Sequence, residues 1–204
     1  MESCIITLEF VQNIIEKRKR EIHKGDCGRI LIAAGSAGMA GAAILSCKGA
    51  LRAGSGLVQA AVPEALFPIV QTGVPEATCL KRDFSKIDLS RYDAAAAGPG
   101  LGEREDSVRA VRKIITDFDG PVVLDADALN IIAHNDLFDM IKARNEGKTV
   151  ITPHPGEAGR LLGYKVGGSE EERREAALAL YEKTGAITIL KGQATVVATD
   201  SQKT

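Results

Sequence analysis

Short apolar runs that stop abruptly at glycine or polar clusters are the feature of this sequence that most constrains its fold. Arg29–Ala34 stops at Gly35-Ser36, and Tyr92–Ala97 stops at Gly98-Pro99-Gly100-Leu101-Gly102. Runs of this length that end so sharply predict fully buried strands. Further runs of the same kind are Leu57–Val62, Pro121–Leu124, Thr149–Thr152 and Ile187–Leu190, and Ala194–Thr199 is expected to pair behind the last of them.

Segments with helical spacing lie between the predicted strands. Ala40–Ala53 is a run of small residues, and Val108–Ile115 repeats apolar residues at helical intervals. Ser169–Thr184 opens with Ser169 and Glu172 in the positions of a capping box. Strands alternating with helices predict an α/β fold with a mostly parallel sheet. We expect one domain over residues 1–204, because no repeat or linker divides the chain.

The N-terminal segment predicts an amphipathic helix outside this alternation. Leu8, Val11 and Ile14 keep helical spacing after Thr7, a possible N-cap. Apolar residues precede the basic run 17–20, which is the reverse of a signal peptide. No window approaches 18 consecutive apolar residues, so no membrane span is predicted and we expect a cytoplasmic protein.

Charge and cysteine content exclude several classes of function. Lys and Arg total 26 against 27 Asp and Glu, and aromatic residues make up only 4%. The chain therefore has neither the basic field nor the stacking surface of a nucleic-acid-binding protein. Its cysteines are Cys4, Cys27, Cys47 and Cys79, without a Cys-x-x-Cys pair. We therefore expect reduced, mostly buried thiols, and no protein metal site is predicted.

Glycine and polar clusters follow five of the predicted strands. They are Gly35-Ser36, Gly98–Gly102, Asp125 with Asp127, His154–Glu157 and Lys191–Thr195. Because ligands of parallel sheets bind outside the carboxyl ends of the strands, these clusters are expected to converge at one edge. Glycine turns expose backbone amides, and the helices that follow add dipoles that favour anions. The sequence therefore predicts a site for a phosphate-bearing ligand.

Each cluster taken alone also has a structural interpretation. Gly98–Gly102 could be a tight turn, because it matches neither the Walker A motif nor the dinucleotide fingerprint. Asp127 could be only a helix N-cap, and His154 only a structural residue between two prolines. Lys191–Thr195 could be an ordinary two-residue hairpin with Lys191 in solvent. Convergence of all the clusters on one edge favours the functional interpretation.

Seven motifs resemble, in order, those of the ADP/ATP-dependent (S)-NAD(P)H-hydrate dehydratases. They are His23–Gly28, Gly35–Ala43, Ala50–Val58, Gly98–Gly102, Leu124–Asn130, Thr152–Glu157 and Leu190–Thr195. The resemblance implies a ribokinase-like three-layer fold. It also implies a repair reaction, in which ADP or ATP phosphorylates the hydroxyl of hydrated NADH or NADPH and elimination restores the dihydropyridine.

By motif position, the resemblance assigns two sets of binding residues. Ala42, Gly102 and His154 would contact the hydrated nicotinamide nucleotide. The phosphate donor's AMP part would lie against Lys191, Gly192, Gln193, Ala194 and Thr195. Lysine suits phosphate as a point charge, and glycine lets the backbone approach closely. Mg²⁺ is expected between the phosphates, and a homotetramer is expected by resemblance alone.

One family feature has no counterpart in the printed residues. A Gly-Thr-Gly-Asp loop, whose Asp is the base, would follow the last motif, but no glycine occurs after Gly192. The base is therefore expected beyond Thr204, and residues 1–204 alone are expected to fold with difficulty or as an oligomer and to have little activity. The alternatives are a vitamin-alcohol kinase of the same fold and a non-catalytic nucleotide-binding protein.

Overall fold

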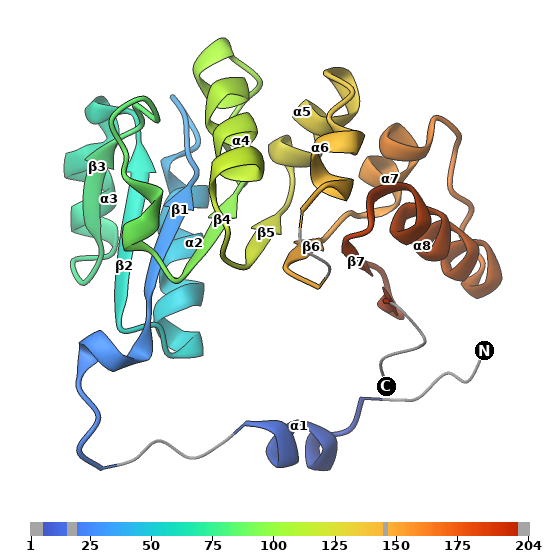
Figure 1. Ribbon diagram of the computed structural model, residues 1–204, viewed down its shortest axis with the longest axis horizontal. Helices are drawn as coiled ribbons and strands as arrows, with labels where there is room; N and C mark the ends of the chain where they lie inside the picture. The colour runs from blue at the N-terminus through green and yellow to red at the C-terminus, as the bar shows by residue number, and fades with distance from the viewer. Residues whose placement is uncertain (1–5, 16–19, 145–146, 200–204) are drawn as a thin grey trace.

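The computed structural model describes residues 6–15, 20–144 and 147–199. Cys4, most of the basic run 17–20 and the segment 200–204 lie outside the described residues. Figure 1 shows a central sheet flanked by helices, with an N-terminal helix set apart from it.

The eight strands form one sheet in the order β3-β2-β1-β4-β5-β6-β7-β8. All neighbouring pairs are parallel except β7 and β8, which are antiparallel. The strands are β1 Arg29–Ala33, β2 Leu57–Val62, β3 Thr78–Lys81, β4 Ala94–Ala97, β5 Val122–Leu124, β6 Thr149–Ile151, β7 Ile187–Leu190 and β8 Val196–Ala198. The mostly parallel sheet expected from the apolar runs is confirmed. The predicted bounds of β2 and β7 match the observed ones, and the ends of the other predicted strands differ by at most two residues.

The helices occupy most of the intervals between strands. They are α1 Leu8–Ile14, α2 Ala40–Ala53, α3 Phe67–Gly73, α4 Glu105–Asp117, α5 Asp127–His134, α6 Phe138–Lys142, α7 Pro155–Leu162 and α8 Glu170–Thr184, with short 3-10 helices at Lys24–Cys27, Glu64–Leu66 and Leu89–Arg91. The predicted capping box of α8 is confirmed, because Ser169 Oγ accepts from Glu172 N (3.2 Å) and Glu172 Oε2 from Ser169 N (2.9 Å). Strand β3 and helices α3, α6 and α7 were not predicted as elements.

Alternate residues of β1 divide the core into two apolar layers. Ile32 and Ala34 pack with α2 and α3 on one face of the sheet. Leu31 and Ala33 pack with α4 to α8 on the other face. Because successive side chains of a strand point to opposite faces, helices on both faces give three layers. The predicted α/β three-layer fold is confirmed.

The two faces of the middle strands are not equally covered. Ala97, Leu124 and Ile151 are in register on neighbouring strands and are all buried. The residue that precedes each of these three points to the opposite face of the sheet. One of those preceding residues, Val123, is 40% exposed. Apolar surface therefore remains uncovered on the face that carries α2 and α3.

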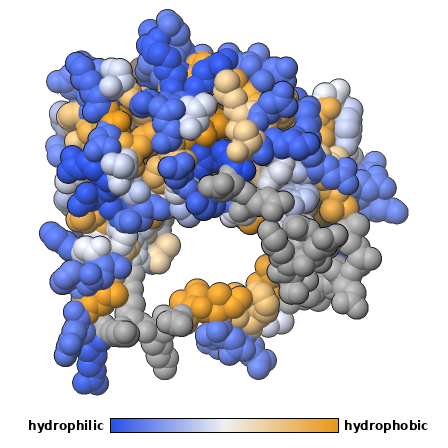
Figure 2. All heavy atoms as spheres, viewed as in Figure 1, coloured by the Kyte–Doolittle hydropathy of each residue, from blue (hydrophilic) through white to orange (hydrophobic). Residues whose placement is uncertain are grey.

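Helix α1 forms where it was predicted but buries none of its residues. Thr7 caps it by accepting a hydrogen bond from Phe10 N (3.2 Å). Leu8, at 74% exposure, and Ile14 leave the apolar stripe of the helix uncovered, and Figure 2 shows this apolar surface. The local pattern thus specifies the helix without specifying what it packs against.

The structure also bears on the expectations about membrane spans and cysteines. No helix in residues 6–15, 20–144 or 147–199 is long and apolar enough to cross a membrane. Cys27, Cys47 and Cys79 are free thiols, but the expectation that the thiols are mostly buried is wrong for the described residues, because Cys27 and Cys79 are only partly buried. Burial, with a smaller contribution from Cys79, raises the pKa of Cys47 to about 11, so this thiol is uncharged at neutral pH.

Candidate functional site

The predicted clusters meet at the carboxyl edge of the sheet, as the parallel topology requires. Gly35 N donates to Pro99 O (2.9 Å), which joins the loops after β1 and β4. Lys191 N donates to Pro153 O (2.8 Å), which joins the loops after β7 and β6. Neighbouring loops are therefore tied by their backbones along this edge (Figure 1).

Glycines in the loop after β4 allow close contact with two neighbouring segments. At Gly98, whose φ is +132°, a Cβ atom would lie 1.7 Å from the carbonyl oxygen of Asp125. At Gly100, a Cβ atom would lie 2.8 Å from the Cβ of Ala42. The predicted substrate residue Ala42 thus lies on α2 directly against this loop, which no larger residues could form.

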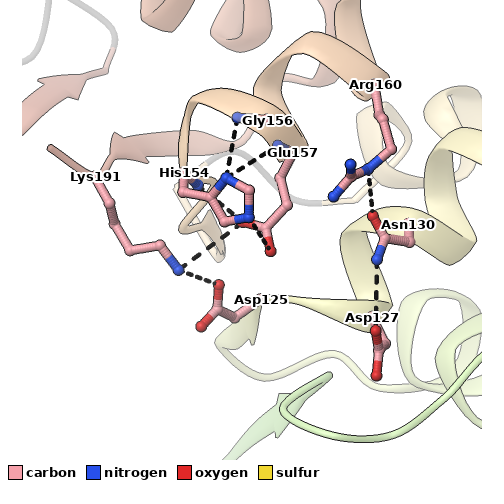
Figure 3. A network of polar contacts seen from close by, with 8 residues as sticks. All are labelled: Asp125, Asp127, Asn130, His154, Gly156, Glu157, Arg160 and Lys191. Carbon is pink, nitrogen blue, oxygen red and sulfur yellow. Dashed lines mark hydrogen bonds and ion pairs between the residues drawn. The ribbon is translucent and has the colours of Figure 1, made fainter.

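Asp127 binds the same loop from the other side. Its Oδ2 accepts a hydrogen bond from Gly102 N (2.8 Å), the second predicted substrate residue. Its Oδ1 accepts from Asn130 Nδ2 (3.4 Å), and Arg160 Nε donates to Asn130 Oδ1 (2.8 Å), as Figure 3 shows. The N-cap interpretation of Asp127 is wrong, because α5 begins at Asp127 and Ala126 occupies the cap position. The carboxylate orients a glycine turn instead.

Ala126 has an uncommon backbone conformation between two aspartates. Its φ and ψ angles are 48° and −121°, a region that a residue with a Cβ atom rarely adopts. Such a conformation costs on the order of 1–3 kcal/mol and persists only where surrounding contacts impose it. The strained turn directs Asp125 and Asp127 into separate polar networks.

His154 is the N-cap of α7, in a segment predicted as a loop. Its Nδ1 accepts hydrogen bonds from Gly156 N (3.0 Å) and Glu157 N (3.4 Å), so a neutral ring carries its proton on Nε2. That Nε2 lies 3.3 Å from Glu157 Oε1. Glu157 Oε2 accepts from His154 N (2.8 Å), which completes a capping box. His154 thus has the structural role of capping α7, and its half-exposed ring remains accessible to a ligand.

Lys191 is paired with a carboxylate, not simply solvated. Its Nζ donates to Asp125 Oδ1 (2.7 Å) and lies 4.0 Å from Glu157 Oε2. The Glu157 side chain is only 7% exposed, whereas that of Lys191 is 41% exposed. Glu157 therefore contacts both His154 and Lys191, the residues predicted for the two ligands (Figure 3). This geometry meets the requirement that the two predicted subsites adjoin.

The remaining predicted nucleotide residues form an exposed connection between β7 and β8. Gly192, Gln193, Ala194 and Thr195 are all exposed. Arg173 of α8 supports the loop, because its Nη1 donates to Ala194 O (2.8 Å). A Cβ atom at Gly192 would lie 2.4 Å from the same Nη1. The strands do form an antiparallel hairpin, but the predicted two-residue turn is wrong, because residues 191–195 connect β7 to β8. The backbone of this loop remains open to a ligand.

An open hollow of about 860 Å³ lies beside α4 and the segments that follow β2 and β3. Its described lining comes from the segments after β2 and β3 and from α4, and it includes Lys81, Arg109 and Lys113 but none of the predicted site residues. Lys81 is paired with Glu64 (3.6 Å), Lys113 with Asp117 (2.7 Å) and Arg109 with Glu105. Because none of the predicted site residues lines this hollow, we do not assign the phosphate ligand to it.

Comparison with known proteins decides the family. A family model described as NAD(P)H-hydrate dehydratase matches residues 30–204. The ADP-dependent (S)-NAD(P)H-hydrate dehydratase of Bacillus subtilis is 35% identical over 196 residues, covering 94% of this chain and 68% of that protein. The chain belongs to the NAD(P)H-hydrate dehydratase family.

Other members of the NAD(P)H-hydrate dehydratase family are longer. The bifunctional NAD(P)H-hydrate repair enzyme Nnr of Escherichia coli is 39% identical over 192 residues, covering 93% of this chain but 36% of that protein. The present chain thus spans little more than a third of that relative.

Solved structures give the same fold for this dehydratase-family chain. The ADP/ATP-dependent NAD(P)H-hydrate dehydratase from Bacillus subtilis, co-crystallized with ATP/Mg2+, has a TM-score of 0.80 and 34% identity, covering 95% of this chain and 68% of that one. A ribokinase-like superfamily protein from Enterococcus faecalis has a TM-score of 0.81 at 18% identity, which supports the fold alone. The predicted ribokinase-like fold is confirmed.

Sequence reasoning missed several residues that lie at or near this candidate site of the dehydratase-family chain. Glu157 was part of a predicted motif, but nothing in the pattern marked it as the link between His154 and Lys191. Arg173 lies on a helix whose charges gave no functional signal. Arg82 follows a strand, β3, that was not predicted, so its position at the carboxyl edge could not be inferred.

Proposed function

We propose that this protein repairs nicotinamide nucleotides by ADP- or ATP-dependent dehydration of the S epimer of hydrated NADH or NADPH. The observation that carries the proposal is the contact of Glu157 with both His154 and Lys191. That contact places a half-exposed imidazole and a lysine at neighbouring strand ends. Transfer of a phosphoryl group from one nucleotide to another requires two such adjoining subsites.

The proposed reaction replaces a poor leaving group with a good one. The ring hydroxyl of the hydrated nucleotide attacks the terminal phosphorus of the donor and gives its proton to a general base. The bond from that phosphorus to the donor's bridging oxygen breaks, so AMP leaves from ADP, or ADP from ATP. The phosphorylated oxygen then leaves with the electrons of the carbon–oxygen bond, pushed by the ring nitrogen lone pair. Loss of a proton from the adjacent carbon restores the dihydropyridine. The transfer needs positioning and charge neutralisation more than covalent help.

The residues of this chain would bind and orient the two nucleotides. We assign Ala42, Gly102 and His154 to the hydrated nucleotide, with His154 Nε2–H as a hydrogen-bond donor. The donor nucleotide would lie along the exposed backbone of residues 192–195. Lys191 would exchange part of its pairing with Asp125 for contact with phosphate, because a lysine binds phosphate as a point charge.

Mg²⁺ fits this arrangement only as an ion carried by the nucleotide. In the described part of the chain, no group of three or more His, Cys, Asp or Glu side chains could hold a metal. Mg²⁺ commonly uses one or two carboxylates together with substrate phosphates. Asp125, beside Lys191, is the carboxylate that could contribute. The ion would neutralise phosphate charge during transfer.

Binding and turnover measured side by side test the proposal. Calorimetry with NADPH and with ADP is expected to give saturable binding of each. The substitution Lys191→Met is expected to weaken the binding of ADP and leave that of NADPH unchanged. ADP-dependent gain of dihydropyridine absorbance from (S)-hydrated NADPH would establish the reaction. Consumption of ATP with hydroxymethylpyrimidine or hydroxyethylthiazole, and none with the hydrate, would instead favour a vitamin-alcohol kinase. Absence of binding to either nucleotide would refute the proposal.

We further propose that residues 1–204 form one dehydratase domain and that the protein is a cytoplasmic homotetramer. The single continuous sheet and the free thiols support the first two points. Exposed apolar residues of α2 and α3, namely Leu45 and Ile69, support the third. Mass measurement in solution is expected to give four chains, and a monomer would contradict it.

A further inference from the structure

Arg82 lies directly after β3 and reaches two of the glycine loops. Its side chain is only 3% exposed. Nη1 donates to Gly35 O (2.8 Å) in the loop after β1 and, more weakly, to Leu101 O (3.4 Å) in the loop after β4. One planar guanidinium therefore contacts both loops from beneath, with donors in a rigid arrangement that a lysine could not reproduce.

A carboxylate holds this guanidinium in place. Arg82 Nη2 and Nε donate to Asp106 Oδ2 at 2.7 and 3.2 Å. Burial alone would raise the pKa of Asp106, but the hydrogen bond and positive charge of Arg82 outweigh it, and the pKa is lowered. Asp106 is thus charged at neutral pH, and the buried arginine has the counter-charge that its burial requires.

The two carbonyls that Arg82 binds adjoin the predicted substrate residues. Leu101 immediately precedes Gly102, and its carbonyl also accepts from Ser107 Oγ (2.9 Å). Gly35 precedes Ser36, whose side chain a Cβ atom at Gly102 would approach to 3.8 Å. Any movement of the guanidinium would therefore change the spacing of the loops on which the Gly102 amide and Ser36 lie.

We propose that Arg82 is a positioning residue that sets the spacing between the loops at Gly35 and Leu101 and so shapes the subsite for the nicotinamide nucleotide. The inference rests on the proposed function for the identity of the ligand. Arg82 acts here through backbone carbonyls without touching the substrate. Its substitution is expected to weaken nicotinamide nucleotide binding selectively, because the nucleotide loop 191–195 makes no contact with it.

Arg144 provides a matched control for the loss of a buried arginine. Its Nη1 donates to Ile114 O, Ile115 O and Phe118 O at 3.1, 2.8 and 2.7 Å, its Nη2 to Gly120 O (2.8 Å) and its Nε to Thr149 Oγ1 (2.9 Å). These groups lie at the end of α4 and at the start of β5 and β6. Arg144→Gln therefore removes a comparable cluster of bonds at the opposite edge of the sheet.

The test compares Arg82→Gln with Arg144→Gln under conditions in which both variants are folded. Calorimetry is expected to show NADPH binding weakened by at least tenfold in Arg82→Gln and changed by less than twofold in Arg144→Gln. That loss corresponds to one charge-assisted hydrogen bond or more. ADP affinity is expected to change by less than twofold in both. Equal NADPH affinity in the two variants would overturn the proposal, as would equal weakening of NADPH and ADP.

Amide hydrogen exchange gives a second readout that needs no ligand. Arg82→Gln is expected to accelerate exchange at residues 35–39 and 98–102 more than Arg144→Gln does. If Arg82→Gln does not fold, Arg82→Lys and Asp106→Asn replace it in the same measurements. Arg82→Lys keeps the positive charge and is expected to keep only part of the NADPH affinity. Failure of the unaltered protein to bind NADPH would refute the proposed function alone. Unchanged exchange in these loops would then refute the positioning role.

Discussion

Two arginines hold backbone carbonyls at opposite edges of the same sheet. Arg144 binds the end of α4 at the amino edge, and Arg82 binds two glycine loops at the carboxyl edge. Arg82 is paired directly with Asp106, whereas the described contacts of Arg144 are to carbonyls and one hydroxyl. Burial, partly offset by the charge of Asp119, lowers the pKa of Arg144.

The difference between the two edges shows how one kind of bond serves two purposes. At the amino edge the carbonyls belong to a helix end, where an arginine satisfies acceptors that the helix leaves unpaired. At the carboxyl edge they belong to turns that bring amides and side chains together at the proposed ligand site. Contacts at the amino edge should therefore affect folding stability alone, whereas contacts at the carboxyl edge should affect ligand recognition as well as stability.

The largest expected effect is on stability, at the amino edge. Arg144→Gln leaves several carbonyls without a donor and is expected to lower the free energy of unfolding by about 3 kcal/mol. Urea denaturation measures this loss. Ligand affinity of the folded fraction should stay within twofold, so a large loss of NADPH affinity would remove the distinction between the edges.

The next largest effect is on nucleotide binding, at the carboxyl edge. Lys191→Met is expected to weaken ADP binding by roughly 10–100-fold, the value of one charge-assisted bond to phosphate. Calorimetry at two salt concentrations would also show a weaker salt dependence. Lys148→Met is the control, because Lys148 Nζ donates to Asp119 O (3.1 Å) at the amino edge. An equal loss of ADP affinity in Lys191→Met and Lys148→Met would contradict the assignment of Lys191 to the phosphate donor.

A smaller effect is expected at the strained turn of the carboxyl edge. Ala126→Gly relieves the φ of 48° and is expected to stabilise the protein by about 1 kcal/mol, after allowance for the greater freedom of the unfolded chain. Thermal unfolding measures the gain. Ala133→Gly, within α5, should instead destabilise by about 1 kcal/mol. Destabilisation by both changes would show that Ala126 is not strained.

The smallest effect is the dependence of stability on acid pH. The pKa of Asp106 is lowered in the folded protein, so the unfolded chain takes up this proton first as the pH falls. The contribution of the pair with Arg82 is therefore complete above the ordinary Asp pKa of about 3.9 and is lost as the pH falls through the lowered value. The free energy of unfolding of Asp106→Asn, measured from pH 2 to pH 7, should therefore lack this loss. A pH dependence identical to that of the unaltered protein would contradict a stabilising pair between Asp106 and Arg82.

The sequence predicted the sheet well because buried parallel strands have strong local signals. The run Arg29–Ala34, for example, ends at a glycine and contains only one charged residue. Strand β3 escaped prediction because Thr78, Cys79, Leu80 and Lys81 form neither an apolar run nor a clear alternation, and the strand is partly exposed at the edge of the sheet.

The motifs identified candidate site residues, but they did not show which residues those side chains and amides contact. Gly102 and Lys191 stood out because glycine clusters and a lysine followed strands. Their partners Asp127 and Asp125 are 25 and 66 residues away in the sequence. Such pairings depend on which strands are neighbours, and local pattern does not state that order. Arg82 was missed because it follows β3, which was not predicted as a strand.

A crystal structure of the protein with NADPH and ADP tests the central claim most directly. The account predicts the nicotinamide ring against Gly102 and His154, the adenosine phosphate along residues 191–195, and both ligands at the carboxyl edge above Arg82. Either nucleotide bound at the Arg144 edge, or within the hollow beside α4, would contradict it.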